Sequence, residues 1–157
     1  MRKDFMFTSQ SVTEGHPDKL CDQISDAIVD SFLQQDPFSR IITECAVSTG
    51  VVFIAARYAS DAKIDFADVA RKIILQSGYE QDSFNAEDAT ILTSLGQLAP
   101  YDHPPTDEHG MSDEEIDQVT VKNQANAFGF ACNQTTAKMP LPIWLARRLS
   151  RRLSVLR

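Results

Sequence analysis

The segment GHPDK at residues 15–19 places an imidazole, a carboxylate and an ammonium group within four residues. Apolar residues at spacings of three and four follow directly and predict a helix over 17–35. The first turn of a helix has unpaired N–H groups and partial positive charge, so it attracts phosphate. A carboxylate such as Asp18 suits Mg²⁺, which typically takes one or two carboxylates together with substrate phosphates. His16, Asp18 and the helix start together indicate a site for a magnesium polyphosphate.

A purely structural explanation of the same residues stays open. Ser11 and Glu14 have the spacing of a capping box, in which two side chains satisfy backbone N–H groups at a helix start. Asp18 in the first turn would then only stabilise the helix dipole. The acidic residues at steps of four from Asp18 to Asp30 favour a solvated face, because a four-residue step drifts around the helix. The sequence is compatible with a cap and with a phosphate–metal site.

The elements around this segment predict an α+β layer. Strands are expected at four segments, 5–9, 40–48, 51–58 and 89–95. Thr49-Gly50 has the length of a two-residue hairpin turn. A second amphipathic helix is expected over 64–77, and Gly78 is its natural stop. The order β-α-β-β-α-β predicts one antiparallel-rich sheet with helices on one face.

The character of the sequence changes after residue 96. Residues 96–117 are rich in proline and acids, which predicts a long exposed loop or linker. Another strand is expected at 127–132, and a basic amphipathic helix begins at Pro140 with its leucines on one stripe. These two elements predict the incomplete start of a second, similar unit. Binding of the basic helix to a membrane surface is the less favoured alternative, because leucine stripes at helical spacing are more often core.

Charge and composition narrow the possible functions. The net charge is −7, but residues 1–117 carry 8 basic and 22 acidic side chains, whereas 118–157 carry 7 basic and none acidic. An acidic body argues against nonspecific nucleic-acid binding and suits metal cations. No long apolar window predicts a membrane helix, and the N-terminus lacks the apolar core of a signal peptide. Three cysteines without a C-x-x-C pair favour a reduced, cytoplasmic setting over a disulfide framework or zinc site.

The segment FTSQSVTEGHPDKLCDQISDAIVD closely resembles the N-terminal signature of S-adenosylmethionine synthetase, also called methionine adenosyltransferase. TECAVSTG, the GY pair at 78–79, FGFACNQT and MPLPIWLARRL are similar to further segments of that family, in register. The resemblance covers essentially the whole chain, although the family's subunits are well over twice as long. It implies an N-terminal domain at 1–96, a flexible active-site loop at 97–117 and the truncated start of a central domain at 118–157.

The resemblance also implies a reaction and the residues that perform it. The family joins ATP and methionine: the methionine sulfur attacks C5′ of the adenosine, the triphosphate leaves, and it is cleaved to pyrophosphate and phosphate. His16 matches the catalytic histidine beside the triphosphate, and with Lys19 it is expected to bind ATP. Asp18 matches a Mg²⁺ ligand and Glu44 a K⁺ ligand.

Three positions depart from the family's pattern. Arg57 stands where the family has a glutamate that holds the methionine amino group, and an arginine repels that ammonium. Gln97 matches the glutamine at the start of the lid only if the loop shifts by one residue. Asn123 replaces an aspartate in a glycine-rich turn. These departures leave two alternatives beside the enzyme: a non-catalytic structural or regulatory relative that pairs with a full-length synthetase, and a truncated product without function.

The resemblance further implies an assembly. The family's active site is shared between two subunits, so we expect a homodimer or tetramer, or a heteromer with a longer synthetase chain. Strands 40–58 are expected at the contact, and no nucleic-acid or membrane partner is expected. The isolated chain is expected to be inactive, and the acidic loop 97–117 to be mobile without ligand.

Overall fold

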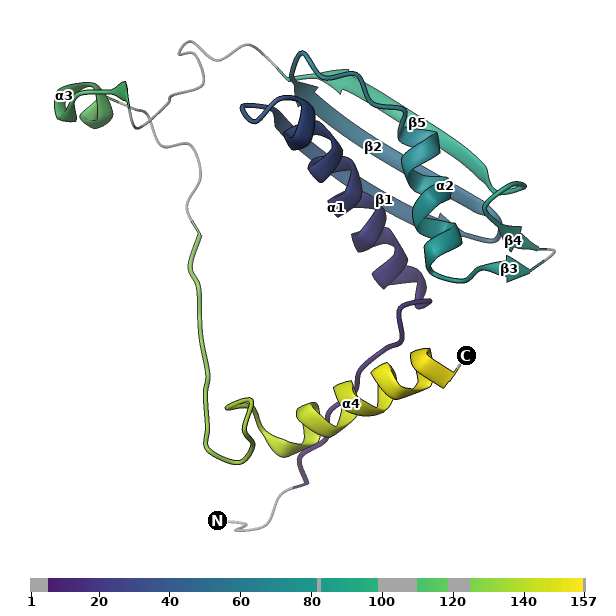
Figure 1. The fold of residues 1–157 in the computed structure, drawn as a ribbon. Helices are drawn as coiled ribbons and strands as arrows, with labels where there is room; N and C mark the ends of the chain where they lie inside the picture. The colour runs from purple at the N-terminus through teal and green to yellow at the C-terminus, as the bar shows by residue number, and fades with distance from the viewer. Residues whose placement is uncertain (1–5, 82, 99–109, 119–124, 157) are drawn as a thin grey trace.

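A computed structural model describes residues 6–81, 83–98, 110–118 and 125–156 (Figure 1). The elements in chain order are α1 Pro17–Gln35, β1 Arg40–Ser48, β2 Val51–Ala59, α2 Phe66–Gln76, β3 Glu80–Gln81, β4 Phe84–Asn85, β5 Thr90–Gln97, α3 Asp113–Asp117 and α4 Leu141–Leu156. The predicted α+β class is confirmed, and both predicted amphipathic helices of the first unit form within a few residues of their expected bounds.

The main sheet has the order β1-β2-β5. β1 and β2 are an antiparallel hairpin, and Thr49 and Gly50 connect them with φ of 42° and 82°, the positive values that a tight two-residue turn requires. β5 runs parallel to β2, because α2 carries the chain back across the sheet before β5 begins. A small hairpin of β3 and β4, which the sequence did not predict, lies between α2 and β5.

One face of the sheet holds the core. α1 and α2 both lie on that face, which Figure 1 shows with the sheet behind them. The fully buried side chains come from alternate positions of β2 and from positions three and four apart in the helices, as the two periods require. They include Leu20, Ile24, Ile28, Phe32, Val52, Ile54 and Ile74. The other face of the sheet is exposed and carries Ile42, Phe53 and Leu92.

Two predicted strands are wrong. The described part of segment 5–9 and the whole of segment 127–132 have no regular structure. Met6 and Phe128 are at least nine-tenths exposed, and neither segment pairs with another strand in the described chain. A strand needs a ladder partner and an apolar face to bury, and neither condition is met here.

The predicted loop at 97–117 is partly regular. Gln97 is the last residue of β5, and Asp113–Asp117 form α3. Ser112 and Glu115 make a capping box: the Ser112 hydroxyl accepts the Glu115 N–H, and the Glu115 carboxylate accepts the Ser112 N–H. Residues 99–109, on which the predicted mobility mainly depends, lie outside the described residues.

The basic helix α4 lies beside the N-terminal segment near the start of α1 (Figure 1). Ser150 is its one buried residue, and the Ser150 hydroxyl lies 3.1 Å from the Ser11 carbonyl oxygen, to which it can donate. The leucine stripe stays outside this contact, since Leu149 and Leu153 are both more than 60% exposed. α4 therefore contacts the first unit through a polar residue rather than through its apolar stripe.

Candidate functional site

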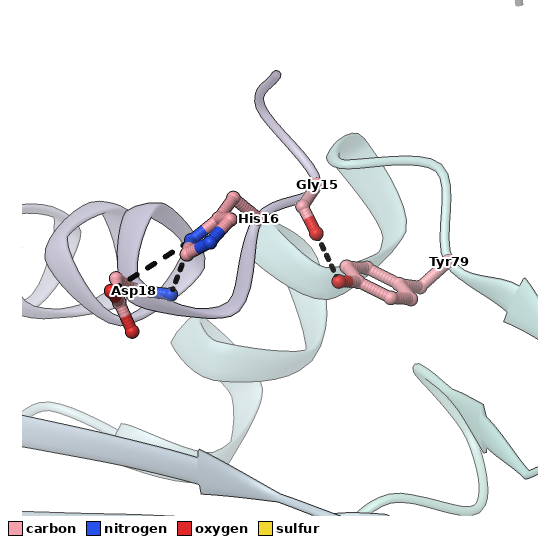
Figure 2. Close-up of polar contacts among 4 residues, drawn as sticks. All are labelled: Gly15, His16, Asp18 and Tyr79. Carbon is pink, nitrogen blue, oxygen red and sulfur yellow. Dashed lines mark hydrogen bonds and ion pairs between the residues drawn. The ribbon is translucent and has the colours of Figure 1, made fainter. Parts of the chain in front are cut away.

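His16 forms the cap at the start of α1. It has extended backbone geometry, as expected for a residue before proline, and its Nδ1 accepts the Asp18 N–H at 3.2 Å (Figure 2). The predicted capping box of Ser11 and Glu14 is therefore wrong, because the imidazole fills the capping position. With Nδ1 accepting, a neutral ring carries its proton on Nε2 and keeps that N–H available as a donor.

The residue before His16 is fixed by the end of α2. Gly78 has φ of 74°, and the N–H groups of Gly78 and Tyr79 bond carbonyls of the last helical turn in the pattern of a Schellman motif. This turn aims the Tyr79 hydroxyl at the Gly15 carbonyl oxygen, to which it donates a hydrogen bond (Figure 2). The GY pair at 78–79 was predicted only as a match to the family, and its positioning role was not predicted.

A cleft of about 740 Å³ lies between the start of α1 and α4. Its first wall contains the side chains that the sequence singled out, together with neighbouring acids: Glu14, His16, Asp18, Lys19 and Asp22. Its second wall comes from α4: Ile143, Arg147, Ser150, Arg151 and Ser154. The structure therefore brings His16, Asp18 and Lys19 together at one open site.

The charged groups of the cleft are largely unpaired. The Asp18 side chain is 93% exposed, and its nearest charged neighbour is His16, whose Nδ1 lies 3.9 Å from Asp18 Oδ2. That separation is too long for a hydrogen bond. Within the described parts of the chain, no other ion pair involves a side chain of the cleft. Both signs of charge thus remain available to a ligand.

No group of three or more His, Cys, Asp or Glu side chains in the described chain is placed to hold a metal ion. Asp18 alone still fits Mg²⁺, because this ion commonly takes one carboxylate and completes its shell with water and phosphate oxygens. Glu44 is elsewhere: it is exposed in β1, opposite Ala55, on the face of the sheet that the helices do not cover. The structure does not bring Glu44 into the cleft.

Arg57 and Gln97 lie at the opposite end of the domain from His16. The Asp36 carboxylate at the end of α1 accepts the Ser60 hydroxyl just after β2, so Arg57 is near this end. Gln97 ends β5 beside β2. α1 has 19 residues, which corresponds to a length of about 28 Å. One chain therefore keeps these two predicted residues away from the cleft, and Asn123 lies outside the described residues.

Two cysteines lie behind the start of α1. The thiols of Cys21 on α1 and Cys45 on β1 hydrogen-bond each other, and neither cysteine forms a disulfide. Burial raises the pKa of Cys21, and it raises the pKa of Cys45 to about 12. These thiols stay protonated at neutral pH and act as packing groups rather than nucleophiles.

Fold and site together define an α+β domain whose helix start borders an open cleft of mixed charge, a class suited to phosphate ligands. Family models of S-adenosylmethionine synthetase match the chain twice, with the N-terminal domain over residues 4–100 and the central domain over 118–157. The chain belongs to the S-adenosylmethionine synthetase family. Its described helices include none that is long and apolar enough to cross a membrane.

Similar curated proteins carry the same family name. The chain is 42% identical to the S-adenosylmethionine synthase of Gloeothece citriformis (strain PCC 7424), 43% to that of Acaryochloris marina (strain MBIC 11017) and 44% to that of Crocosphaera subtropica (strain ATCC 51142 / BH68). Each alignment covers 100% of this chain and 39% of the relative. The chain thus spans about two fifths of the length of these relatives.

Proposed function

We propose that this chain is the N-terminal part of a cytoplasmic methionine adenosyltransferase that makes S-adenosylmethionine from ATP and methionine. Residues 1–96 would be its N-terminal domain, 97–117 the active-site loop and 118–157 the start of the central domain. The observation that carries this proposal is the start of α1, where His16 and the exposed Asp18 carboxylate border the cleft of about 740 Å³. Family membership supplies the reaction that such a phosphate site would serve.

In this reaction the methionine sulfur forms a bond to C5′ of the adenosine as the bond from C5′ to the triphosphate oxygen breaks. The triphosphate leaves with the electron pair and is then hydrolysed to pyrophosphate and phosphate. The role of the protein is to stabilise the negative charge that develops on the departing oxygen. His16 would donate its Nε2–H there, and Lys19 and the start of α1 would hold the phosphates.

Two ions belong to the proposal. Asp18 would hold Mg²⁺, which when bound neutralises charge on the polyphosphate and improves it as a leaving group. Glu44 is the proposed K⁺ ligand, but its surroundings fit that role only in part. It is the lone acidic side chain of the outer sheet face in the described chain, so no second carboxylate of this face would share the ion with it.

The outer face of the sheet supports a shared site. Ile42, Phe53 and Leu92 are 43–60% exposed on it, and an apolar patch of this kind commonly marks an interface. We expect a homodimer or tetramer, or a heteromer with a longer synthetase chain. In a two-fold dimer, the Arg57 and Gln97 end of one chain can meet the His16 end of the other. ATP and methionine would then bind between subunits.

A regulatory subunit without catalysis is the second candidate. Arg57, exposed at the position where an acid is expected for the methionine ammonium, is the observation that favours it. An arginine there repels the ammonium group of methionine rather than pairing with it.

A mixing experiment separates the two candidates. The chain is combined with a full-length synthetase that has been inactivated at its own matching histidine, and S-adenosylmethionine is measured by chromatography. We expect product from wild type and from the control Asp26→Asn, which removes an exposed carboxylate of α1 outside the cleft, and none from His16→Ala. Association without product from wild type would establish the regulatory subunit and contradict the enzyme.

A further inference from the structure

The cleft has a second wall, on α4, that the proposed function leaves unexplained. We propose that Arg147 and Arg151 on this helix form a polyphosphate-binding face opposite His16 and Asp18. The ligand class is a polyphosphate with its divalent cation, either free or as part of a nucleoside triphosphate. This inference rests on the proposed function for the identity of the site, and it adds the residues that hold the ligand from the other side.

Only two of the four arginines of α4 line the cleft. Arg147 and Arg151 are four residues apart, so they lie on one face, and both line the cleft with the Ser150 and Ser154 hydroxyls. Arg148 and Arg152 do not line it. The Arg148 guanidinium lies 4.7 Å from the centre of the Trp144 ring instead, which gives it a different environment.

The two cleft arginines are not used to hold the fold together. Glu14, Asp18 and Asp22 line the opposite wall, yet no ion pair within 4.0 Å links them to Arg147 or Arg151 among the residues described. An electrostatic latch between α1 and α4 would show such pairs. Carboxylates on one wall and guanidinium groups on the other that form no ion pair suit a ligand with both signs of charge. A metal ion would face the carboxylates, and phosphate oxygens would face the guanidinium forks.

The position of the arginine face is set by a buried contact. Ser150 lies between the two arginines in the sequence and is 8% exposed. Its hydroxyl lies 3.1 Å from the Ser11 carbonyl oxygen and equally far from the Ala146 carbonyl oxygen, so it can donate to one of them at a time. The contact with Ser11 joins α4 to the segment that leads into His16. When the hydroxyl donates to Ser11, this contact holds the arginine face toward the start of α1.

Calorimetric titration of the chain with inorganic tripolyphosphate, with and without Mg²⁺, tests the proposal. Arg147→Gln/Arg151→Gln should weaken binding by about tenfold or more, because charge-assisted hydrogen bonds are lost. The matched control Arg148→Gln/Arg152→Gln removes the same charge from the other side of α4 and should change affinity by less than about twofold. Circular dichroism of both variants verifies that α4 still folds.

Titration with ATP under the same conditions identifies the source of the phosphate. Loss of both ligands in Arg147→Gln/Arg151→Gln, with both retained in the control, supports the proposal. Three results would overturn it: no binding by wild type, equal weakening by both double variants, or unchanged binding by the cleft variant. The mixing experiment tests the proposed function, whereas tripolyphosphate binding tests the arginine face. Binding that depends on Arg147 and Arg151 would support the arginine face even if no S-adenosylmethionine is formed.

Discussion

The two ends of α1 each place an aspartate near the cap, but they use it differently. At the C-terminal end, Asp36 Oδ1 accepts the Phe38 N–H at 3.0 Å, and Oδ2 accepts the Ser60 hydroxyl at 2.8 Å and the Asp61 N–H at 3.3 Å. At the N-terminal end, the Asp18 carboxylate has a single polar contact among the described residues, 3.9 Å from its Oδ2 to His16 Nδ1.

This difference separates a structural carboxylate from one that is free to bind. The oxygens of Asp36 are occupied by its own chain, so they tie α1 to the end of β2. The oxygens of Asp18 face the cleft, beside a His16 ring whose cap hydrogen bond leaves Nε2 available. The capping geometry of α1 thus leaves a carboxylate exposed to the cleft at one end and uses a carboxylate for stability at the other.

The largest expected effect comes from replacing each of the two aspartates in turn and comparing ligand affinity with stability. Asp18→Asn should weaken the binding of Mg²⁺ with ATP by at least about tenfold, because the carboxylate that would hold the ion is lost. Asp36→Asn should leave that affinity unchanged and lower the unfolding midpoint in urea. Calorimetry and urea denaturation on both variants measure the crossover. If ligand binding is weaker in Asp36→Asn but unchanged in Asp18→Asn, our assignment of the two ends is reversed.

The end of α2, where Gly78 and Tyr79 hold the residue before His16 in place, should give a smaller effect. Gly78→Ala places a side chain at φ of 74°, so we expect unfolding to become easier by about 1–2 kcal/mol. Tyr79→Phe removes the hydrogen bond to the Gly15 carbonyl, which should cost about 0.5–1.5 kcal/mol. Urea denaturation gives both values. If Tyr79→Phe changes neither stability nor ligand affinity, the end of α2 does not position the cap.

Acid should affect the structural end of α1 selectively. The hydrogen bond from Ser60 is the largest of the causes that lower the pKa of Asp36 from its usual value of 3.8, so folding favours the ionised form. The stabilisation from this group is therefore present above pH 3.8 and is lost as the pH falls through the lower folded-state pKa. Urea midpoints between about pH 2 and 6 should show a smaller acid loss in Asp36→Asn than in wild type or Asp30→Asn. An identical loss in all three chains would rule out this contribution.

The smallest expected effect concerns the thiols behind the N-terminal end. Because burial raises the pKa of Cys45 to about 12, iodoacetamide should modify Cys45 more slowly than Cys132 at pH 8. Mass spectrometry of peptides after timed quenching measures the two rates, and the same reaction in urea is the control that should remove the difference. Faster modification of Cys45 than of Cys132 in the folded chain would mean that the Cys45 thiol is accessible and would contradict its burial against α1.

Local patterns predicted most of the first unit. The apolar period over 17–35, the turn at Thr49-Gly50 and the stop at Gly78 each depend on neighbours in the sequence, and the structure confirms them. The segment around His16 and Asp18 could be predicted as a candidate site for the same reason, because its polar residues and the helix that follows are neighbours in the sequence.

Features that depend on distant contacts were missed. The parallel pairing of β5 with β2 follows from where α2 returns the chain. The absence of a strand in the described part of segment 5–9 follows from the lack of a pairing partner in the described chain. The cleft face of α4 depends on the contact between Ser150 and Ser11, which are 139 residues apart. No periodicity distinguishes Arg147 and Arg151 from the neighbouring arginines.

Chemical-shift mapping by NMR tests most directly whether the N-terminal end of α1 is the ligand end. The labelled chain is titrated with ATP and Mg²⁺, and the backbone amides at both ends of α1 are followed. We predict the largest shifts at Gly15, His16 and Asp18, with Ser39 and Asp61 unchanged. Largest shifts at Ser39 and Asp61, with an unchanged start of α1, would contradict the account.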